Sequence, residues 1–93
     1  MKRILLHYIA CQVDGHFPMD LYVFKDTDEV ISGILFCPLC SRWYPIKGGL
    51  PEILPDTLRN RKSDRAFLKR WAKFVPKKIL SSGKPHNLEK NCQ

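Results

Sequence analysis

The sequence predicts a small α+β domain, in which a short antiparallel sheet is preceded by a helical turn and followed by a basic helix. Three observations support this prediction. The chain has 93 residues, enough for one domain with a modest core. Between residues 21 and 54, short runs of aliphatic, β-branched and aromatic residues alternate with turn residues. After residue 55 the apolar residues recur with the spacing of a helix.

The first two predicted strands form a hairpin. Residues 21–25 and 30–37 are rich in aromatic and β-branched side chains, which is typical of strands. The polar residues 26–29 between them are predicted to form the turn. Gly33 interrupts the second strand, and a glycine at such a position indicates a bulge or a close approach of another backbone.

Two shorter strands follow, and each of them carries a proline. Residues 42–46 contain Pro45, and residues 50–54 contain Pro51. Because a proline cannot donate a hydrogen bond to a neighbouring strand, both strands are predicted to lie at an edge of the sheet. The Lys-Gly-Gly sequence at 47–49 predicts a tight turn between them, since glycine tolerates positive φ.

Helical segments are predicted on both sides of the sheet. Residues 2–10 are apolar and too short to classify by period, and we assign them a short helical turn. The apolar residues between 58 and 75 fall near one face of a helix, and most basic residues lie elsewhere on it. Asp56 or Ser63 can cap the start of this helix, and Pro76 ends it.

The positive charge of the chain is concentrated in its C-terminal part. Residues 1–55 carry five basic and six acidic side chains, whereas residues 56–93 carry eleven basic and three acidic ones. This asymmetry indicates a polyanionic partner such as RNA, and the alternative is a solvated helix face. No run of eighteen apolar residues occurs, so we expect no membrane span and a cytoplasmic protein.

Three of the four cysteines are spaced for a zinc site. Cys37 and Cys40 form a Cys-x-x-Cys pair, whose two thiolates can bind one ion from a single turn. Cys11 is the third candidate ligand. Either His16 or Asp14 can be the fourth, and imidazole is the better partner for three thiolates. We therefore predict a structural zinc ion held by Cys11, His16, Cys37 and Cys40.

Two other interpretations of the cysteines stay open. All three can be reduced, buried side chains without a metal, because free cysteine is among the most buried residue types. Cys37 and Cys40 can also form a redox-active dithiol, although no βαβ unit surrounds them. Cys92 lies in the polar tail, where we predict a free thiol.

The sequence contains no evident catalytic arrangement. His7, His16 and His86 have no neighbouring pattern of nucleophile and base, and the chain lacks a glycine-rich phosphate loop. Ninety-three residues are also too few for a complete cofactor-binding α/β domain. We therefore predict that the chain is not an enzyme.

The segment 33–54, GILFCPLCSRWYPIKGGLPEIL, combines a cysteine pair, an aromatic-Pro-Ile sequence, a glycine turn and an aliphatic-Pro sequence. Together with residues 5–11 and the Phe17-Pro18 sequence, it resembles the signature of a family of small methyltransferase activators with a zinc-ribbon-like sheet. The resemblance covers residues 1–55. It implies an activator domain at 1–55, with residues 56–93 as a basic helical extension packed on it.

This resemblance implies that the chain supplies no catalytic residue and forms heterodimers with class I methyltransferases that use S-adenosylmethionine. Those enzymes modify tRNA, ribosomal RNA or translation release factors, and S-adenosylmethionine is then bound only through the partner enzyme. Eukaryotic members of the family carry a helical insertion between the two central strands. Only the turn 26–29 occupies that place here, so the chain resembles an archaeal or bacterial member, and the basic C-terminal helix favours the archaeal type.

Two surfaces are predicted to serve these partners. An open edge strand can pair with a strand of the enzyme, and the predicted interface consists of apolar residues near the last strand: Phe17, Ile46, Leu50, Pro51, Ile53 and Leu54. The basic helix is a candidate RNA contact through Arg59, Arg61, Lys62, Arg65, Lys69, Arg70 and Lys73. The rival hypothesis is a free-standing zinc-ribbon module that binds nucleic acid without a methyltransferase.

Overall fold

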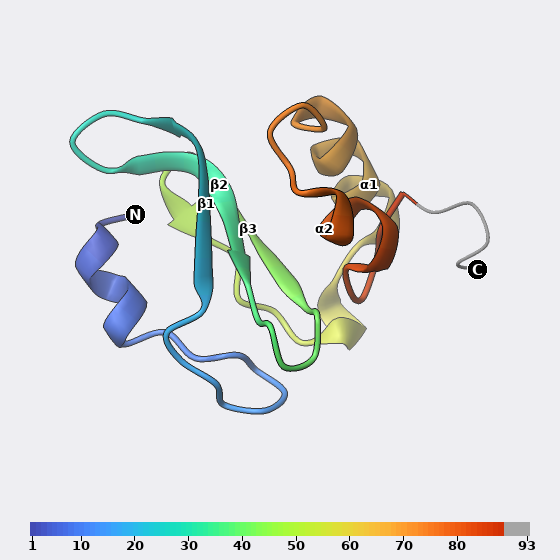
Figure 1. Cartoon of the computed structure of the whole chain (residues 1–93), viewed down its shortest axis with the longest axis horizontal. Helices are drawn as coiled ribbons and strands as arrows, with labels where there is room; N and C mark the ends of the chain where they lie inside the picture. Colours follow the sequence, from blue (N-terminus) through green and yellow to red (C-terminus); the bar gives the residue numbers. More distant parts are fainter. Residues whose placement is uncertain (89–93) are drawn as a thin grey trace.

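The fold is built on a four-stranded antiparallel sheet whose strands follow one another in sequence order (Figure 1). The computed structural model of the chain describes residues 1–88. The strands are β1 (Asp20–Asp26), β2 (Val30–Phe36), β3 (Trp43–Lys47) and β4 (Leu50–Pro51). The helical elements are η1 (Arg3–His7), η2 (Asp56–Leu58), α1 (Arg61–Arg70) and α2 (Lys77–Ser82). The predicted α+β class is confirmed.

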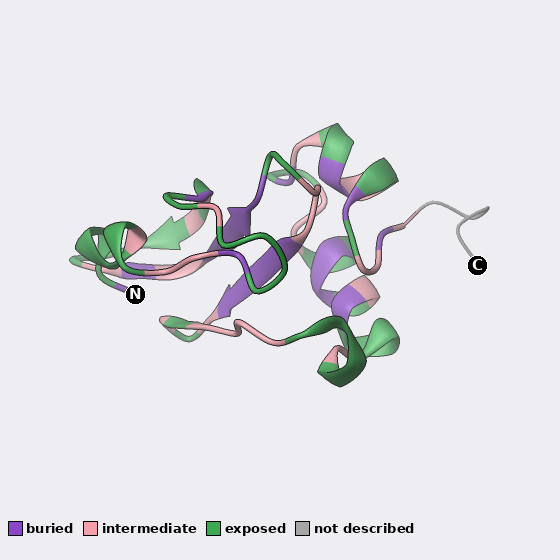
Figure 2. Ribbon diagram, turned by 90° about the horizontal axis from the view of Figure 1, so that it is seen from below, coloured by how far each residue is buried: buried purple, intermediate pink, exposed green. Residues whose placement is uncertain are grey.

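The sheet buries apolar side chains on both of its faces, because successive residues of a strand point to opposite sides. Leu35 and Tyr44 pack on the face that the N-terminal segment 1–19 covers. Ile34 and Trp43 pack on the other face, against α1 and α2. Figure 1 shows η1 and these two helices on opposite sides of the sheet, and Figure 2 shows the buried residues gathered in the strands between them. The division into domains at residue 55 stays a prediction.

Gly33 lies at an irregular part of the pairing between β1 and β2. The register of the two strands shifts between Val23 and Lys25, and again before Asp26. A Cβ atom on Gly33 would collide with the carbonyl oxygen of Tyr22, so only glycine fits this position without a backbone shift. The close approach predicted from the sequence is confirmed.

We expect the Gly33→Ala substitution to lower the free energy of unfolding by about 1–3 kcal/mol, the usual cost of forcing atoms into a packed site. Urea unfolding followed by circular dichroism would measure the change. The neighbouring substitution Ser32→Ala is the control, with an expected change below about 0.5 kcal/mol. Equal stability of Gly33→Ala and the parent chain would contradict the close approach.

β3 is not an edge strand, in contrast to the expectation from Pro45. It lies between β2 and β4, and Pro45 pairs with Ile34 of β2. The carbonyl oxygen of Pro45 accepts a hydrogen bond of 2.9 Å from the backbone N–H of Glu52. The backbone N–H and C=O of one strand residue point to the same side, so an N–H at position 45 would also point away from β2. On that side, β4 has already ended at Pro51. The proline therefore costs the β2–β3 ladder no hydrogen bond.

α1 begins later than the sequence pattern suggested. Its N-cap is Asn60, whose side chain accepts a hydrogen bond of 2.9 Å from the backbone N–H of Ser63. The two predicted caps have other roles, since Asp56 begins η2 and its carboxylate binds Arg42, and Ser63 lies inside α1. None of the helices in residues 1–88 is long and apolar enough to cross a bilayer.

Candidate functional site

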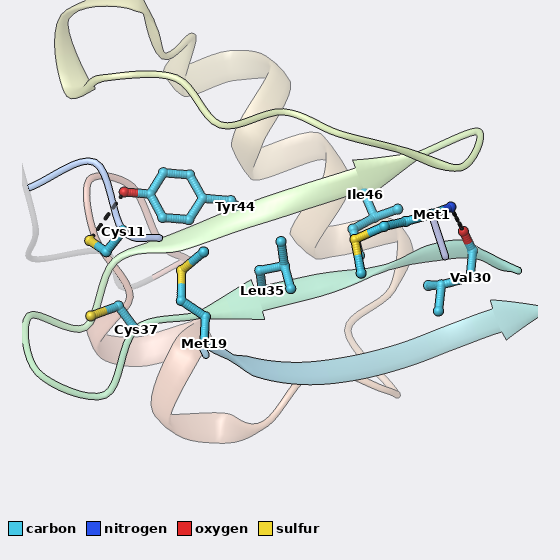
Figure 3. Close-up of a cluster of buried hydrophobic side chains, with 8 residues drawn as sticks. All are labelled: Met1, Cys11, Met19, Val30, Leu35, Cys37, Tyr44 and Ile46. Carbon is cyan, nitrogen blue, oxygen red and sulfur yellow. Dashed lines mark hydrogen bonds between the residues drawn. The ribbon is translucent and has the colours of Figure 1, made fainter. Parts of the chain in front are cut away.

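Four side chains with metal-binding atoms meet where the N-terminal segment approaches the turn after β2. The Sγ atoms of Cys11, Cys37 and Cys40 and a carboxylate oxygen of Asp14 all lie within 4.8 Å of one another. Cys11 and Cys37 are buried, Cys40 is half-buried and Asp14 is exposed. Figure 3 shows Cys11 and Cys37 at one end of the apolar layer that the N-terminal segment covers. We refer to these four residues as the Cys3Asp cluster.

The loop 11–16 turns the carboxylate of Asp14 towards the cysteines. The backbone N–H of Cys11 donates to the carbonyl oxygen of His16, and the N–H of Gly15 donates to the carbonyl oxygen of Cys11, both at 3.0 Å. Gly15 has a φ of 72°, which glycine adopts without strain. The backbone N–H of His16 donates to Oδ1 of Asp14 at 3.0 Å and fixes the carboxylate.

A second turn holds Cys37 and Cys40. The backbone N–H of Cys37 donates to the carbonyl oxygen of Arg42 at 2.8 Å, and the N–H of Ser41 donates to the carbonyl oxygen of Cys37 at 2.9 Å. Ser41 has a φ of 65°, a left-handed conformation that few residues other than glycine adopt. The turn therefore presents both thiols of the Cys-x-x-Cys pair on one side.

The distances within the Cys3Asp cluster suit a tetrahedral metal ion. Two thiolates bound to one ion at about 2.3 Å lie about 3.8 Å apart, and a thiolate and a carboxylate oxygen about 3.6 Å apart. The Sγ atoms of Cys11 and Cys40 are 3.6 Å apart, and Sγ of Cys37 is 3.4 Å from Oδ2 of Asp14. The cluster can therefore bind a metal ion with only small shifts of its side chains.

Burial and hydrogen bonds give the members of the cluster different proton affinities. Burial raises the pKa of the Cys37 thiol to about 12. Burial also acts to raise the pKa of Cys11, but hydrogen bonds, led by the one from the Tyr44 hydroxyl, lower it overall. The N–H of His16 lowers the pKa of the Asp14 carboxyl. A bound cation would favour the thiolate form of every cysteine.

Tyr44 contacts the Cys11 ligand of the cluster, a role that the sequence analysis did not predict. Its hydroxyl lies 3.4 Å from Sγ of Cys11 and accepts a hydrogen bond of 3.2 Å from the backbone N–H of Gln12 (Figure 3). Because the hydroxyl oxygen accepts from Gln12, its proton is available to the Cys11 sulfur. Only the strand register, which turns Tyr44 towards the N-terminal segment, could have indicated this contact.

The structure assembles three of the four predicted zinc ligands. Cys11, Cys37 and Cys40 lie together as the sequence spacing indicated. His16 does not belong to the group, and Asp14 occupies the fourth position instead. Cys92, for which a free thiol was predicted, lies outside the described residues.

The predicted partner surface is only partly open to solvent. Leu50 on β4 is 72% exposed and Phe17 is 59% exposed, whereas Ile46 is completely buried in the core. Pro51, Ile53 and Leu54 are half-buried, and Ile53 packs against the apolar layer beneath the N-terminal segment. Ile46 therefore cannot contact a partner, and Leu50 is the residue of this edge that can reach one most directly.

Further apolar side chains are exposed around the Cys3Asp cluster and on η1. Ile4 and Tyr8 at η1 are 63% and 76% exposed, and Val13 and Leu39 beside the cluster ligands are 56% and 69% exposed. Sequence reasoning missed these residues, because a short apolar run does not reveal which side of it is covered. Exposed apolar side chains mark a surface that a partner protein covers where they form one contiguous patch.

Two of the seven side chains predicted to contact RNA already bind other groups of this chain. Arg59 is buried beside Asp64, at 2.9 Å, and its guanidinium lies over the Trp43 ring. Arg65 donates a hydrogen bond of 2.7 Å to the carbonyl oxygen of Asn87. The five remaining side chains are exposed, and they are Arg61, Lys62, Lys69, Arg70 and Lys73.

Comparison with known proteins gives one informative result. None of the curated proteins is similar enough to count as a match. A family model described as "Trm112p-like protein" matches residues 2–49. The match includes η1, all four residues of the Cys3Asp cluster and the first three strands, and it ends in the turn before β4. Because it spans more than half of the 93 residues, the chain belongs to the Trm112p-like protein family.

Proposed function

We propose that this chain is a non-catalytic subunit that binds, stabilises and activates class I methyltransferases that modify tRNA, ribosomal RNA or translation release factors. The observation that carries the proposal is membership of the Trm112p-like family, which implies a methyltransferase activator in general terms. The proposal includes S-adenosylmethionine bound by the partner enzyme and a cytoplasmic location. The short turn between β1 and β2 supports the archaeal type, which lacks the helical insertion.

We propose that the Cys3Asp cluster binds a structural zinc ion. Its donor set of three sulfurs and one carboxylate oxygen suits zinc, which accepts thiolate and carboxylate ligands. Four protein ligands leave no position for a water molecule, so the ion would have no catalytic role. It would join the loop 11–16 to the turn after β2, and both of these segments expose apolar side chains at their tips.

The proposed docking surface for the methyltransferase is the open edge at β4. β4 has two residues, and its outer edge pairs with no other strand in residues 1–88. An unpaired edge can accept a strand from another protein, and exposed Leu50 would supply an apolar contact there. Large apolar interfaces of this kind stabilise both partners, because binding draws each of them towards the folded state.

We expect a tagged Leu50→Asp variant, purified from the native cells, to lose at least about tenfold of the methyltransferase that co-purifies with the parent chain, as at an interface hot spot. Mass spectrometry of the stoichiometric partners would measure the loss. Leu58→Asp on η2 is the matched control, since Leu58 is 65% exposed and lies outside the proposed edge. Full retention by Leu50→Asp would move the interface away from β4.

The same purification separates the proposed function from its rival. A class I methyltransferase in a one-to-one ratio with the tagged chain supports the activator role. Nucleic acid without any methyltransferase would instead favour a free-standing zinc-ribbon module. In either case, the five exposed basic residues of the α1 region are the candidate contacts to RNA phosphates, and their loss should weaken the salt dependence of RNA binding.

A further inference from the structure

A cleft of about 550 Å³ lies between α1 and the end of the sheet next to the β1–β2 and β3–β4 turns. Its volume is within the range of sites that bind small molecules. Three cations line it, Lys25 from β1, Lys47 from β3 and Arg70 from α1. Among the residues that line it there is no carboxylate. The cleft is therefore a candidate site for an anion.

Along β2 and β3, the side chains that face the helices change from apolar to polar at the cleft. Farther from the β1–β2 and β3–β4 turns, β2 and β3 present the apolar side chains of Ile34 and Trp43 to the helices. Towards the turns, the same strands line the cleft with Ser32 and Lys47. If this end served only to pack α1 on the sheet, apolar side chains would be expected to continue along the strands.

The cations of the cleft are only partly neutralised. Nζ of Lys47 lies 3.5 Å from a carboxylate oxygen of Glu52, and both side chains are partly exposed. Within residues 1–88, neither Lys25 nor Arg70 takes part in an ion pair. The cleft therefore keeps a net positive charge that a bound anion would offset.

Hydroxyl groups and aromatic rings complete the lining. Ser63 in the first turn of α1 accepts a hydrogen bond of 3.3 Å from Nζ of Lys47. The same Nζ lies 5.6 Å from the centre of the Phe67 ring. The half-buried Trp71 ring is held in place by stacking on Phe24, with ring centres 5.4 Å apart. Cations and hydroxyls can bind the phosphate of a nucleotide, and a fixed aromatic ring beside them can contact its base.

We propose that this cleft binds a single nucleotide of an RNA strand, with Lys25, Lys47 and Arg70 around the phosphate and Trp71 beside the base. A solvated basic helix would bind phosphates diffusely, with every exposed cation contributing alike. The cleft differs from such a helix, because three separate elements bring its cations and rings to one place. The inference rests on the proposed function only for the identity of the strand as RNA.

The test compares two double variants that remove the same charge from the full chain. Lys25→Gln with Arg70→Gln acts in the cleft, and Arg61→Gln with Lys69→Gln acts outside it, on exposed residues of α1. Fluorescence anisotropy of a labelled single-stranded RNA of about 12 nucleotides measures the affinity, at low and at high salt. No methyltransferase is present, so failure of the proposed heterodimer and failure of this site are separate results.

At low salt we expect the cleft variant to weaken RNA binding about tenfold and the control variant at most about threefold. Both losses should shrink at high salt, where contacts to phosphates are screened. Uridine monophosphate should compete with RNA for the parent chain and not for the cleft variant. Equal losses in the two variants, or unchanged affinity in the cleft variant, would overturn the proposal. Direct binding of uridine monophosphate to a parent chain that binds no RNA would also overturn it, in favour of a free nucleotide as the ligand.

Discussion

Removal of the proposed zinc ion from the Cys3Asp cluster is expected to destabilise the chain by about 4 kcal/mol, if the free ion is present at about a thousand times its dissociation constant. The Cys37→Ser substitution should abolish stoichiometric zinc binding, because it removes one of the three sulfur donors of the cluster. Metal content by atomic emission and urea unfolding with and without a chelator would measure both effects. The chelator should not destabilise the Cys37→Ser variant any further. Equal stability of the parent chain with and without chelator would contradict a structural metal.

Variants of the loop 11–16 identify the fourth ligand. We expect Asp14→Ala to weaken zinc binding at least about tenfold, since the loss of a group that only orients a ligand already costs about 10–100-fold. His16→Ala should leave zinc binding nearly unchanged, since the His16 side chain is outside the cluster. The backbone N–H of His16, which holds Asp14, remains in the His16→Ala variant. The opposite order of the two variants would restore His16 as the ligand. Competition with a zinc-binding dye measures both affinities.

Loss of the buried carboxylate of Asp64 is expected to cost about 3–5 kcal/mol of folding stability, because it leaves a buried cation without a partner. The Arg59 side chain is 2% exposed, and its Nη2 lies 2.9 Å from Oδ2 of Asp64. Its Nη1 donates a hydrogen bond of 2.7 Å to the carbonyl oxygen of Trp43. Nδ1 of His86 contacts the same carboxylate at 2.8 Å, so Asp64 joins the start of α1 to the segment after α2.

Urea unfolding of Asp64→Ala beside Asp56→Ala would test this expectation. Asp56 forms an ion pair with Arg42 at 2.7 Å, but its side chain is 40% exposed, and exposed pairs contribute about 0–1 kcal/mol. The two variants therefore remove one carboxylate each from a buried and from an exposed pair. If Asp64→Ala lowers the free energy of unfolding no more than Asp56→Ala, the contacts of Asp64 do not stabilise the packing of α1 and the segment after α2.

Features that depend on residues close together in the sequence could be predicted from the sequence. The first three strands follow from short apolar runs and the turn residues between them, and the glycine turn after β3 has positive φ at both Gly48 and Gly49. The prediction of the N-cap of α1 was wrong, because several nearby residues are suitable as caps. Asn60 caps α1, although Asp56 and Ser63 are equally suitable cap residues by type.

Features that depend on three-dimensional placement could not be derived from spacing. The position of Asp14 beside the three thiols depends on hydrogen bonds within the loop 11–16, which close the loop and hold the Asp14 carboxylate. The cleft cations Lys25 and Lys47 are 22 positions apart in the sequence, and only the sheet brings them together. Likewise, the buried state of Ile46 follows from the strand register, which turns its side chain towards the N-terminal segment.

The central claim is that this chain activates a methyltransferase without taking part in the chemistry. The most direct measurement is methyl transfer from S-adenosylmethionine by the co-purified enzyme, assayed alone and after addition of the separately produced chain. The account predicts little activity and weak S-adenosylmethionine binding by the enzyme alone, and recovery of both at one equivalent of the chain. Full activity and full S-adenosylmethionine binding by the enzyme alone, unchanged when the chain is added, would contradict it.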